Sequence, residues 1–330
     1  MTKKLITLLL ALLLAFSLTA CNGGIPAGSP EHTSALMTAE VKTAEVKSDV
    51  TQAPGDSVKP TAEPTEEPTA EPTETPTAAD YSSITVNETV LVDKKGVRIS
   101  AKGLSNDGVF GPELKLLIEN TSGKDLTVQC RNSSVNGYMV ETLMSVDVAN
   151  GKKANDSLTF MRSELLSCGI EAIADMEFSF HIFGTDDWNT YFDTEKIQLK
   201  TSVADTYTYE YDDSGKVIYD KNGIRIIAKG FSADASVLGP GVVVYIENNT
   251  KKDITVQTRD ESVNGFMVGT YFSCEVCAGK RAVDCIVFSS TELDENDIEN
   301  FETVEFSFHI FKTADWNTID DSKPVVLNFN

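Results

Sequence analysis

The alternation of apolar and polar residues is clearest in the run Phe-Ser-Phe-His-Ile-Phe, which occurs twice, beginning at Phe178 and at Phe306. With a side-chain period of two, Phe178, Phe180 and Ile182 fall on one face of a strand and His181 falls on the other. The expected strands are short and frequently interrupted by turn residues, which favours an antiparallel β-sandwich. The expected strands of the first copy are 97–101, 114–119, 126–130, 138–140, 158–161 and 176–183, and those of the second copy include 224–228, 242–247, 254–258 and 304–311.

The whole pattern is duplicated. The segment from Gly111 to Thr190 recurs 128 positions later without a gap. We therefore predict an all-β chain with two tandem immunoglobulin-like antiparallel sandwiches, at residues 82–203 and 207–330, each close to the usual size of one such domain.

Turn and helix signals also recur in both copies. Asn136-Gly137 and Asn264-Gly265 lie between β-type runs, and Asn-Gly is typical of a type I′ hairpin turn because both central residues need a positive φ. One short helix is expected in each copy, at 163–174 and 291–301, since each segment begins with a hydroxyl residue and an early Glu.

Residues 1–20 have the pattern of a bacterial export signal. Lys3 and Lys4 give it a positive start, and the apolar stretch from Leu5 to Phe16 is too short for an ordinary transmembrane helix. The run Leu18-Thr19-Ala20-Cys21 resembles the bacterial lipobox, which implies that the thiol of Cys21 is lipidated and the chain is cut just before it. An ordinary secretory signal with a chance cysteine is the alternative.

Residues 21–80 are expected to form a disordered stalk. Eight of the eleven prolines lie between 22 and 80, and five of them are spaced every four residues among Thr, Ala and Glu. Too few apolar side chains are present to offset the entropy of ordering. In a polyproline II conformation the twenty residues around those prolines would reach about 60 Å, which favours a spacer between a membrane and the folded repeats.

The formal net charge of −22 argues against nucleic acid as a partner. Binding to a phosphate backbone needs clustered Lys and Arg, whereas the basic residues of this chain are scattered. Common enzyme motifs, such as a nucleophile elbow, a zinc-binding HExxH and a phosphate loop, are absent from the sequence, and three histidines leave little for acid-base work.

Taken together, the sequence resembles surface lipoproteins of Gram-positive anaerobes that carry a Pro/Thr/Glu stalk and immunoglobulin-like domains of unknown function. The resemblance rests on the lipobox at Cys21, the Ile-Glu-Asn runs at Ile118 and Ile246, the Ser-Val-Asn-Gly runs at Ser134 and Ser262, and the two Phe-Ser-Phe-His-Ile-Phe strands. It implies a β-sandwich fold and an envelope location, and it implies no catalytic residue.

The two tryptophans of the chain occupy equivalent places, in Asp187-Trp188-Asn189 and Asp315-Trp316-Asn317. An exposed Trp beside Asp and Asn forms a candidate sugar-binding platform, because the ring can stack on a pyranose while the polar groups bind hydroxyls. We favour the simpler interpretation, in which each Trp closes one end of its sandwich while Asp and Asn make turn hydrogen bonds.

We expect no cofactor and no transition-metal site, because no His or Cys cluster with suitable spacing appears in both copies. His181 and His309 are therefore interpreted as residues of a sheet surface. Structural calcium is the one metal hypothesis that stays open. It rests on two groups of acidic residues, Asp186, Asp187 and Asp193 in the first copy and Asp212, Asp213 and Asp220 at the junction, since calcium prefers oxygen ligands.

The cysteines other than Cys21 have no cysteine at the equivalent position of the other copy. Cys274 and Cys277 form a CxxC motif, but it lies in a β-type run rather than at a helix N-terminus, which argues against redox catalysis. If Gly279-Lys280 were a two-residue hairpin turn, Cys274 would face Cys285, and this register predicts a disulfide between them.

We expect a non-catalytic, lipid-anchored protein on the extracellular face of the cell membrane, presenting two binding modules to an envelope component, a glycan or a surface protein. The alternative from another class is a structural spacer or assembly partner of an envelope complex. A third is a glycosidase that uses recurring carboxylates, Glu119 with Glu247 or Glu177 with Glu305.

Overall fold

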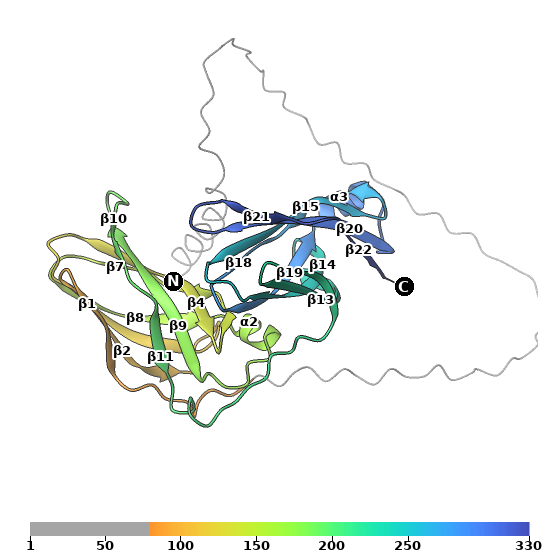
Figure 1. Cartoon of the computed structure of the whole chain (residues 1–330). Helices are drawn as coiled ribbons and strands as arrows, with labels where there is room; N and C mark the ends of the chain where they lie inside the picture. Colours follow the sequence, from red (N-terminus) through yellow and green to blue (C-terminus); the bar gives the residue numbers. More distant parts are fainter. Residues whose placement is uncertain (1–78, 330) are drawn as a thin grey trace, which may run out of the picture. The chain divides into compact units, whose positions relative to one another are not determined.

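The computed structural model describes residues 79–329, and all of them belong to one compact unit. The described chain is all-β and sandwich-like, with two short helices (Figure 1). The predicted signal peptide, the lipidation site Cys21 and nearly all of the predicted stalk lie outside the described residues.

The first repeat contains two antiparallel sheets. One has the strand order β1-β2-β3-β8-β6, and in the other β9 lies beside β4, β10 and β11 pair with β9, and β5 and β7 pair with β4. The bounds are β1 Thr89–Lys94, β2 Val97–Ser105, β3 Glu113–Asn120, β4 Leu126–Val135, β5 Tyr138–Met139, β6 Thr142–Leu143, β7 Ser145–Val148, β8 Lys152–Phe160, β9 Asp175–Gly184, β10 Thr190–Asp193 and β11 Ile197–Lys200.

The second repeat has the same pairing pattern. Its first sheet has the order β12-β13-β14-β19-β17, and its second places β15 beside β20, with β16 and β18 on β15 and with β21 and β22 on β20. The bounds are β12 Lys216–Lys221, β13 Ile224–Ser236, β14 Gly239–Asn248, β15 Ile254–Val263, β16 Phe266–Met267, β17 Thr270–Tyr271, β18 Ser273–Val276, β19 Arg281–Phe288, β20 Thr303–Lys312, β21 Thr318–Asp321 and β22 Val325–Asn328.

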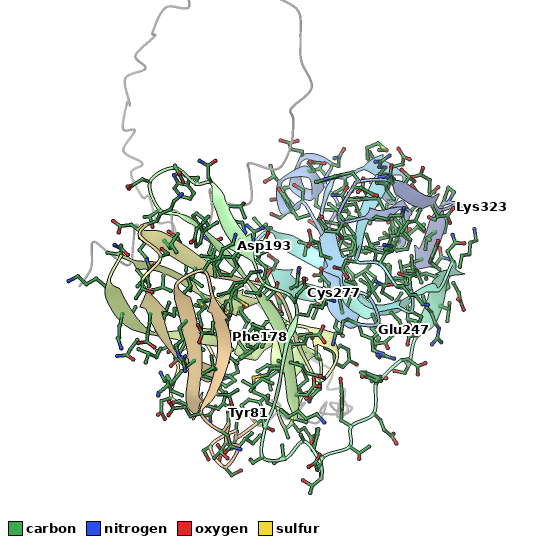
Figure 2. All side chains as sticks on the ribbon, turned by 60° about the vertical axis from the view of Figure 1, so that its left-hand side comes forward. Tyr81, Phe178, Asp193, Glu247, Cys277 and Lys323 are labelled. Carbon is green, nitrogen blue, oxygen red and sulfur yellow. The ribbon has the colours of Figure 1, made fainter. Side chains whose placement is uncertain are left out.

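Each repeat buries a core between its two sheets. In the first repeat Ile99 and Leu116 come from one sheet and Phe178 and Phe180 from the other, all at most 1% exposed. Phe178 lies inside the first repeat in Figure 2. The predicted alternation of the Phe-Ser-Phe-His-Ile-Phe run is confirmed, because its first, third and fifth residues are completely buried in both copies.

The Ile-Glu-Asn runs owe their shared sequence to a buried asparagine. Asn248 is fully buried, and its side-chain amide donates to the carbonyl oxygens of Lys252 and Val276, both at 2.8 Å. Its side-chain oxygen accepts from the Thr250 amide at 3.0 Å. Asn120 makes the equivalent bonds in the first repeat. This residue therefore ties a turn to a strand of the second sheet, and it satisfies the buried carbonyl of Val276, or of Val148 in the first repeat.

The hairpin predictions are confirmed and the helix predictions are too long. Asn136-Gly137 connects β4 to β5 with φ values of +49° and +85°, and Asn264-Gly265 connects β15 to β16 in the same way. Among residues 79–329 the helices are α2, Arg162–Ser167, and α3, Ser290–Glu295. Their lengths differ from the prediction because the chain enters a left-handed conformation at Gly169 and at Asp297, with φ values of +65° and +53°, which ends a helix.

The two repeats are in direct contact. A parallel bridge between Tyr138 of β5 and Arg281 of β19 joins the second sheet of the first repeat to the first sheet of the second repeat. Tyr245 of the second repeat is 1% exposed and belongs to the core cluster of the first repeat. The junction is thus a packed interface within the described chain.

Candidate functional site

The candidate site is a solvent-facing surface of the sheet that contains β9 in the first repeat and β20 in the second. Alternate residues of β9 point away from the core, and among them are His181 and Phe183. The strand register places Gln129 of β4 and Asp193 of β10 directly opposite His181, so all these side chains share one face.

The loop from β9 to β10 holds Trp188 in a fixed position. The Gly184 amide donates to the Asn189 carbonyl at 3.0 Å, and the Trp188 amide donates to the Gly184 carbonyl at 2.9 Å. The Asn189 amide also donates to the Asp187 carboxylate at 3.0 Å. This closed loop leaves Trp188 at a φ of +57°, a conformation that a bulky L-residue rarely adopts.

The loop from β20 to β21 repeats this geometry. The Asn317 amide donates to the Asp315 carboxylate at 3.1 Å, and Trp316 has a φ of +59°. Hydrogen bonding from the Asn317 amide lowers the pKa of Asp315, and the Asn189 amide lowers that of Asp187 in the same way. Each loop therefore presents an ionised carboxylate beside its Trp.

Both tryptophans are exposed, so the interpretation that each one closes an end of its sandwich is wrong. Trp188 is 75% and Trp316 is 62% exposed. Each indole stacks on a buried Phe of the preceding strand, Trp188 on Phe183 with ring centroids 5.6 Å apart and Trp316 on Phe311 at 5.3 Å. One ring face is thus supported by the protein, and the high exposure leaves the other open to a ligand.

A histidine continues each aromatic stack. The His181 ring lies 5.1 Å from the Phe183 ring, and its Nδ1 atom lies 2.5 Å from Oδ1 of Asp193. In the second repeat, His309 lies 5.2 Å from Phe311, and its Nδ1 atom lies 2.6 Å from Oδ1 of Asp321. The histidines are sheet-face residues, as the sequence predicted, and each is fixed in place by its Asp.

Polar side chains from neighbouring strands complete the surface. The Gln129 amide donates to the Ser145 hydroxyl at 3.2 Å, and Gln257 and Ser273 repeat this bond at the same distance. We call this surface the aromatic face. In the first repeat it comprises Gln129, Ser145, His181, Phe183, Trp188 and Asp193, and in the second Gln257, Ser273, His309, Phe311, Trp316 and Asp321.

The six residue types of the aromatic face are identical in the two copies. Core packing does not explain this identity, because most of these side chains lie on the solvent side of the sheet. Some other exposed positions are also retained, such as Lys124 with Lys252 and Arg131 with Arg259, whereas Glu141 has become Gly269.

The acidic residues proposed for calcium do not converge. Asp193 pairs with His181, Asp212 pairs with Lys229 at 2.6 Å, and Asp213 pairs with Arg225 at 2.7 Å. Within residues 79–329 no group of three His, Cys, Asp or Glu side chains is arranged to hold a metal ion.

Three of the four carboxylates considered for a glycosidase, Glu119, Glu177 and Glu247, are paired with cations. Glu247 accepts from Arg281 at 2.8 Å, and Glu177 lies 3.1 Å from the Lys280 ammonium. Glu119 contacts Lys153.

The predicted disulfide between Cys274 and Cys285 is absent, and both residues are free thiols. The hairpin register behind the prediction is wrong, because β18 pairs with β15 in one sheet while β19 pairs with β14 in the other. Burial raises the pKa of Cys277 and of Cys285 to about 11 and that of Cys274 well above its usual value. Such thiols are poor nucleophiles at neutral pH.

Sequence reasoning missed the His–Asp pairs and the Gln–Ser pairs of the aromatic face. The signal was present, since Asp193 and Asp321 each follow their His by 12 residues. Recognising it required the register of β10 on β9 and of β21 on β20, which sequence alone does not provide.

No helix among residues 79–329 has the length and apolar character needed to cross a membrane. No protein-family model matches the chain, and no curated protein matches it. A crystal structure of the YadV chaperone is similar over 71% of this chain and 100% of its own, with 11% identity and a TM-score of 0.22. A score this low assigns neither a fold nor a function.

Proposed function

We propose that this chain is a non-catalytic, lipid-anchored protein of the outer cell surface whose two repeats are immunoglobulin-like binding modules. Each module binds a glycan of the cell envelope through its aromatic face. The observation that carries the proposal is the pair of exposed tryptophans, Trp188 and Trp316, held at positive φ and supported by Phe183 and Phe311 in the same way in both repeats.

The chemistry of the aromatic face fits a sugar. An indole with one open face stacks on the apolar C–H face of a pyranose, and the Phe beneath it limits its motion. The carboxylates of Asp187 and Asp315 accept hydrogen bonds, and Gln and Ser side chains on the same face both donate and accept. Backbone strain at each Trp supports a functional role, since such strain concentrates at ligand-binding sites.

The net charge of the chain limits the kinds of glycan that it can bind. The chain has a formal net charge of −22, so a polyanionic polymer would be repelled at moderate ionic strength. We therefore expect a neutral or amino-sugar-containing glycan. Two modules on one chain would raise the apparent affinity for a repeating polymer, because the second binding event is intramolecular.

The anchoring part of the proposal rests on the sequence of residues 1–80. The export signal and lipobox support attachment at Cys21, and the Pro-rich stalk supports display of the repeats at a distance from the membrane. Two or more acyl chains would give stable attachment, whereas one chain alone gives only marginal binding.

The test is a glycan and peptidoglycan binding screen with the chain from residue 22 to 330, which includes every described residue. Trp188→Ala, Trp316→Ala and the double variant are compared with Val237→Ala, a fully exposed apolar residue away from the aromatic face. We expect specific binding that each single variant weakens and the double variant abolishes. Binding that survives the double variant would overturn the proposal.

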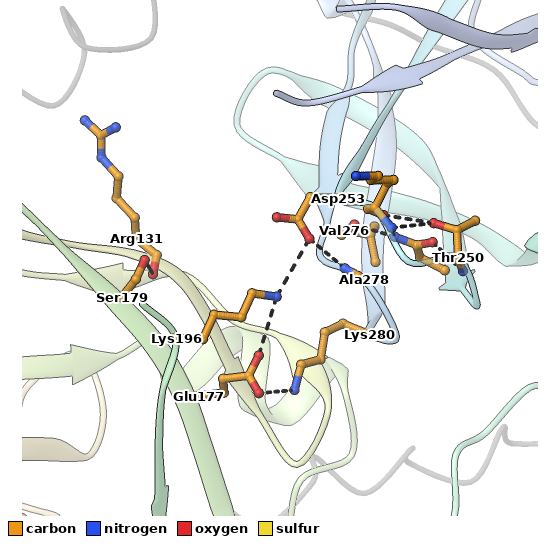
Figure 3. Close-up of polar contacts among 11 residues, drawn as sticks. Arg131, Glu177, Ser179, Lys196, Thr250, Asp253, Val276, Ala278 and Lys280 are labelled. Carbon is orange, nitrogen blue, oxygen red and sulfur yellow. Dashed lines mark hydrogen bonds and ion pairs between the residues drawn. The ribbon is translucent and has the colours of Figure 1, made fainter. Parts of the chain in front are cut away.

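A structural spacer is the second candidate function, and the packed junction between the repeats favours it. Lys196 lies 3.7 Å from both Glu177 and Asp253, and Lys280 lies 3.1 Å from Glu177, so ion pairs reinforce the junction (Figure 3). Lack of glycan binding by a folded chain would favour this candidate.

A further inference from the structure

The two repeats carry the same hairpin tip in different surroundings. The tips are Tyr138-Met139 in Ser-Val-Asn-Gly-Tyr-Met-Val and Phe266-Met267 in Ser-Val-Asn-Gly-Phe-Met-Val. Tyr138 is 2% exposed, whereas Phe266 and Met267 are 50% and 68% exposed. The second tip is thus an apolar surface whose equivalent in the first repeat is covered.

Both tips are equally well fixed to their own repeat. The Asn136 amide donates to the Ala172 carbonyl at 2.7 Å, and the Asn264 amide donates to the Asn300 carbonyl at the same distance. Both tips also pair with their preceding strand in the same register. The exposure of Phe266 therefore reflects a missing neighbour rather than a different local fold.

The structure shows what covers the first tip. The Arg281 amide of β19 donates to the Gly137 carbonyl at 2.9 Å. The Tyr138 ring lies 5.5 Å from the Tyr211 ring and 6.1 Å from the Tyr209 ring of the segment between the repeats, and 6.2 Å from the Tyr245 ring of the second repeat. Met139 packs against the core cluster of the second repeat. An ion pair between Glu177 and Lys280 at 3.1 Å lies beside the tip (Figure 3).

The partners in this interface have counterparts on the opposite repeats. Glu305 of the second repeat corresponds to Glu177, and Lys152 of the first repeat corresponds to Lys280. Lys153 corresponds to Arg281, and it pairs with Glu119 as Arg281 pairs with Glu247. The second repeat thus carries its own copy of the tip and of its Glu, and the first repeat carries its own copy of the strand edge that accepts a tip.

The acceptor edge of the first repeat is open. Within the described chain, β8 pairs with β3 along one side, and on its other side it pairs only with β6, at Thr159 and Phe160. Lysines on an edge usually oppose strand pairing. The equivalent Lys280 and Arg281 nevertheless accept a tip, because Glu177 and Glu247 neutralise them.

We propose that a second copy of this chain docks head to tail, with the Phe266-Met267 tip of one molecule on the β8 edge of the next at Lys153. Glu305 of one molecule then pairs with Lys152 of the other, as Glu177 pairs with Lys280 within the chain. The interface joins two different surfaces, so repeated association produces an open row of molecules or a ring rather than a symmetric dimer.

The association is weaker than the contact within the chain. At the acceptor, Tyr245, Val283 and Arg281 are replaced by Leu117, Asn155 and Lys153, which offer less apolar surface. Contact within the chain also gains from linkage, which the contact between molecules lacks in solution. Molecules anchored side by side on a membrane would recover part of that advantage.

The experiment is sedimentation velocity over a concentration series, with the mature chain carrying Cys21→Ser so that no lipid is attached. We expect the average mass to rise with concentration. Replacing both tip residues, Phe266→Ser with Met267→Ser, should weaken association at least tenfold, whereas Val237→Ser, at an exposed apolar residue elsewhere, should leave it unchanged.

Charge reversal provides the decisive comparison. Glu305→Lys alone and Lys152→Glu alone should each weaken association about fivefold or more, because like charges then meet. A chain with both changes should associate as the unmodified chain does, since the pair is restored with its signs exchanged. A chain that stays monomeric at concentrations up to about 1 mM would overturn the proposal. Failure of the double change to restore association would also overturn it.

Discussion

Backbone strain at the exposed tryptophans predicts that glycine is more stable than alanine at position 316. Trp316 has a φ of +59° in the loop between β20 and β21. A left-handed conformation costs an L-residue about 1–2 kcal/mol, and glycine escapes this cost because it has no Cβ atom. Trp316→Ala keeps the Cβ atom and its strain, whereas Trp316→Gly removes both.

The difference in stability between the two variants can be worked out because the loss of the indole is common to both. Both variants lose the stacking of Trp316 on Phe311, whose ring centroids are 5.3 Å apart. Glycine also makes the unfolded chain more flexible, which lowers the free energy of unfolding by about 0.4–1 kcal/mol relative to alanine. Taking the middle of each range, about 1.5 kcal/mol of relieved strain less about 0.7 kcal/mol leaves Trp316→Gly more stable than Trp316→Ala by roughly 0.8 kcal/mol.

The same loop provides a matched control. Ala314 is exposed and is not among the positive-φ residues, so Ala314→Gly relieves no strain. That change should therefore lower the free energy of unfolding by about 0.4–1 kcal/mol. Glycine is thus expected to have opposite effects at two positions separated by a single residue.

Urea unfolding followed by circular dichroism measures both comparisons. Reading the backbone signal avoids the change in fluorescence that accompanies loss of a Trp. If Trp316→Ala proved as stable as Trp316→Gly or more stable, the strain argument would be refuted, and with it one support for the binding role of the loop. Position 188 should repeat the result, since Trp188 has a φ of +57°.

Three further predictions concern a core asparagine, a buried glutamate of α2 and the thiols. Asn248→Ala should lower the free energy of unfolding by about 2 kcal/mol, because it leaves the buried Val276 carbonyl unpaired and removes the bonds to the less buried Lys252 carbonyl and Thr250 amide. A loss below about 1 kcal/mol in urea unfolding would contradict this. Burial raises the pKa of Glu164 to about 7, from a usual value of 4.5. The folded chain binds the proton of the Glu164 carboxyl more tightly than the unfolded chain does, so the stabilisation from this group is complete below pH 4.5 and is lost as the pH rises through about 7. Glu164→Gln should therefore make the free energy of unfolding less dependent on pH between 4.5 and 7. An unchanged pH dependence in this variant would disprove the raised pKa of Glu164. Cys274 and Cys277 should resist alkylation in the native chain at pH 7 and react after unfolding, whereas fast native labelling at either would contradict the raised thiol pKa values.

Much of the fold could be predicted because its signals are local. Alternation in the Phe-Ser-Phe-His-Ile-Phe runs indicates strands with one buried face, and Asn136-Gly137 indicates a turn that needs two positive φ values. The helix prediction extended too far because it gave weight to the start signals and passed over Gly169, which ends α2.

Properties that depend on long-range pairing could not be predicted. The proposed Cys274–Cys285 disulfide assumed that consecutive strands share a sheet, whereas the chain passes from one sheet to the other between β18 and β19. The exposure of Trp188 could not be predicted either, since a duplicated aromatic residue gives the same sequence pattern whether its side chain is buried or exposed. The exposure of Tyr138 and that of Phe266 differ for a similar reason, because each is set by a neighbouring segment that the hairpin sequence does not specify.

The most direct test of the central claim is a titration followed by tryptophan fluorescence. The chain contains two tryptophans, and both belong to the aromatic face, so their emission reports on the proposed sites alone. With a glycan identified in the binding screen, the account predicts a saturable shift of emission to shorter wavelength, with protection from acrylamide quenching and about half the change retained in each single Trp→Ala variant. A glycan that binds the chain with no change in tryptophan emission or quenching would contradict the account.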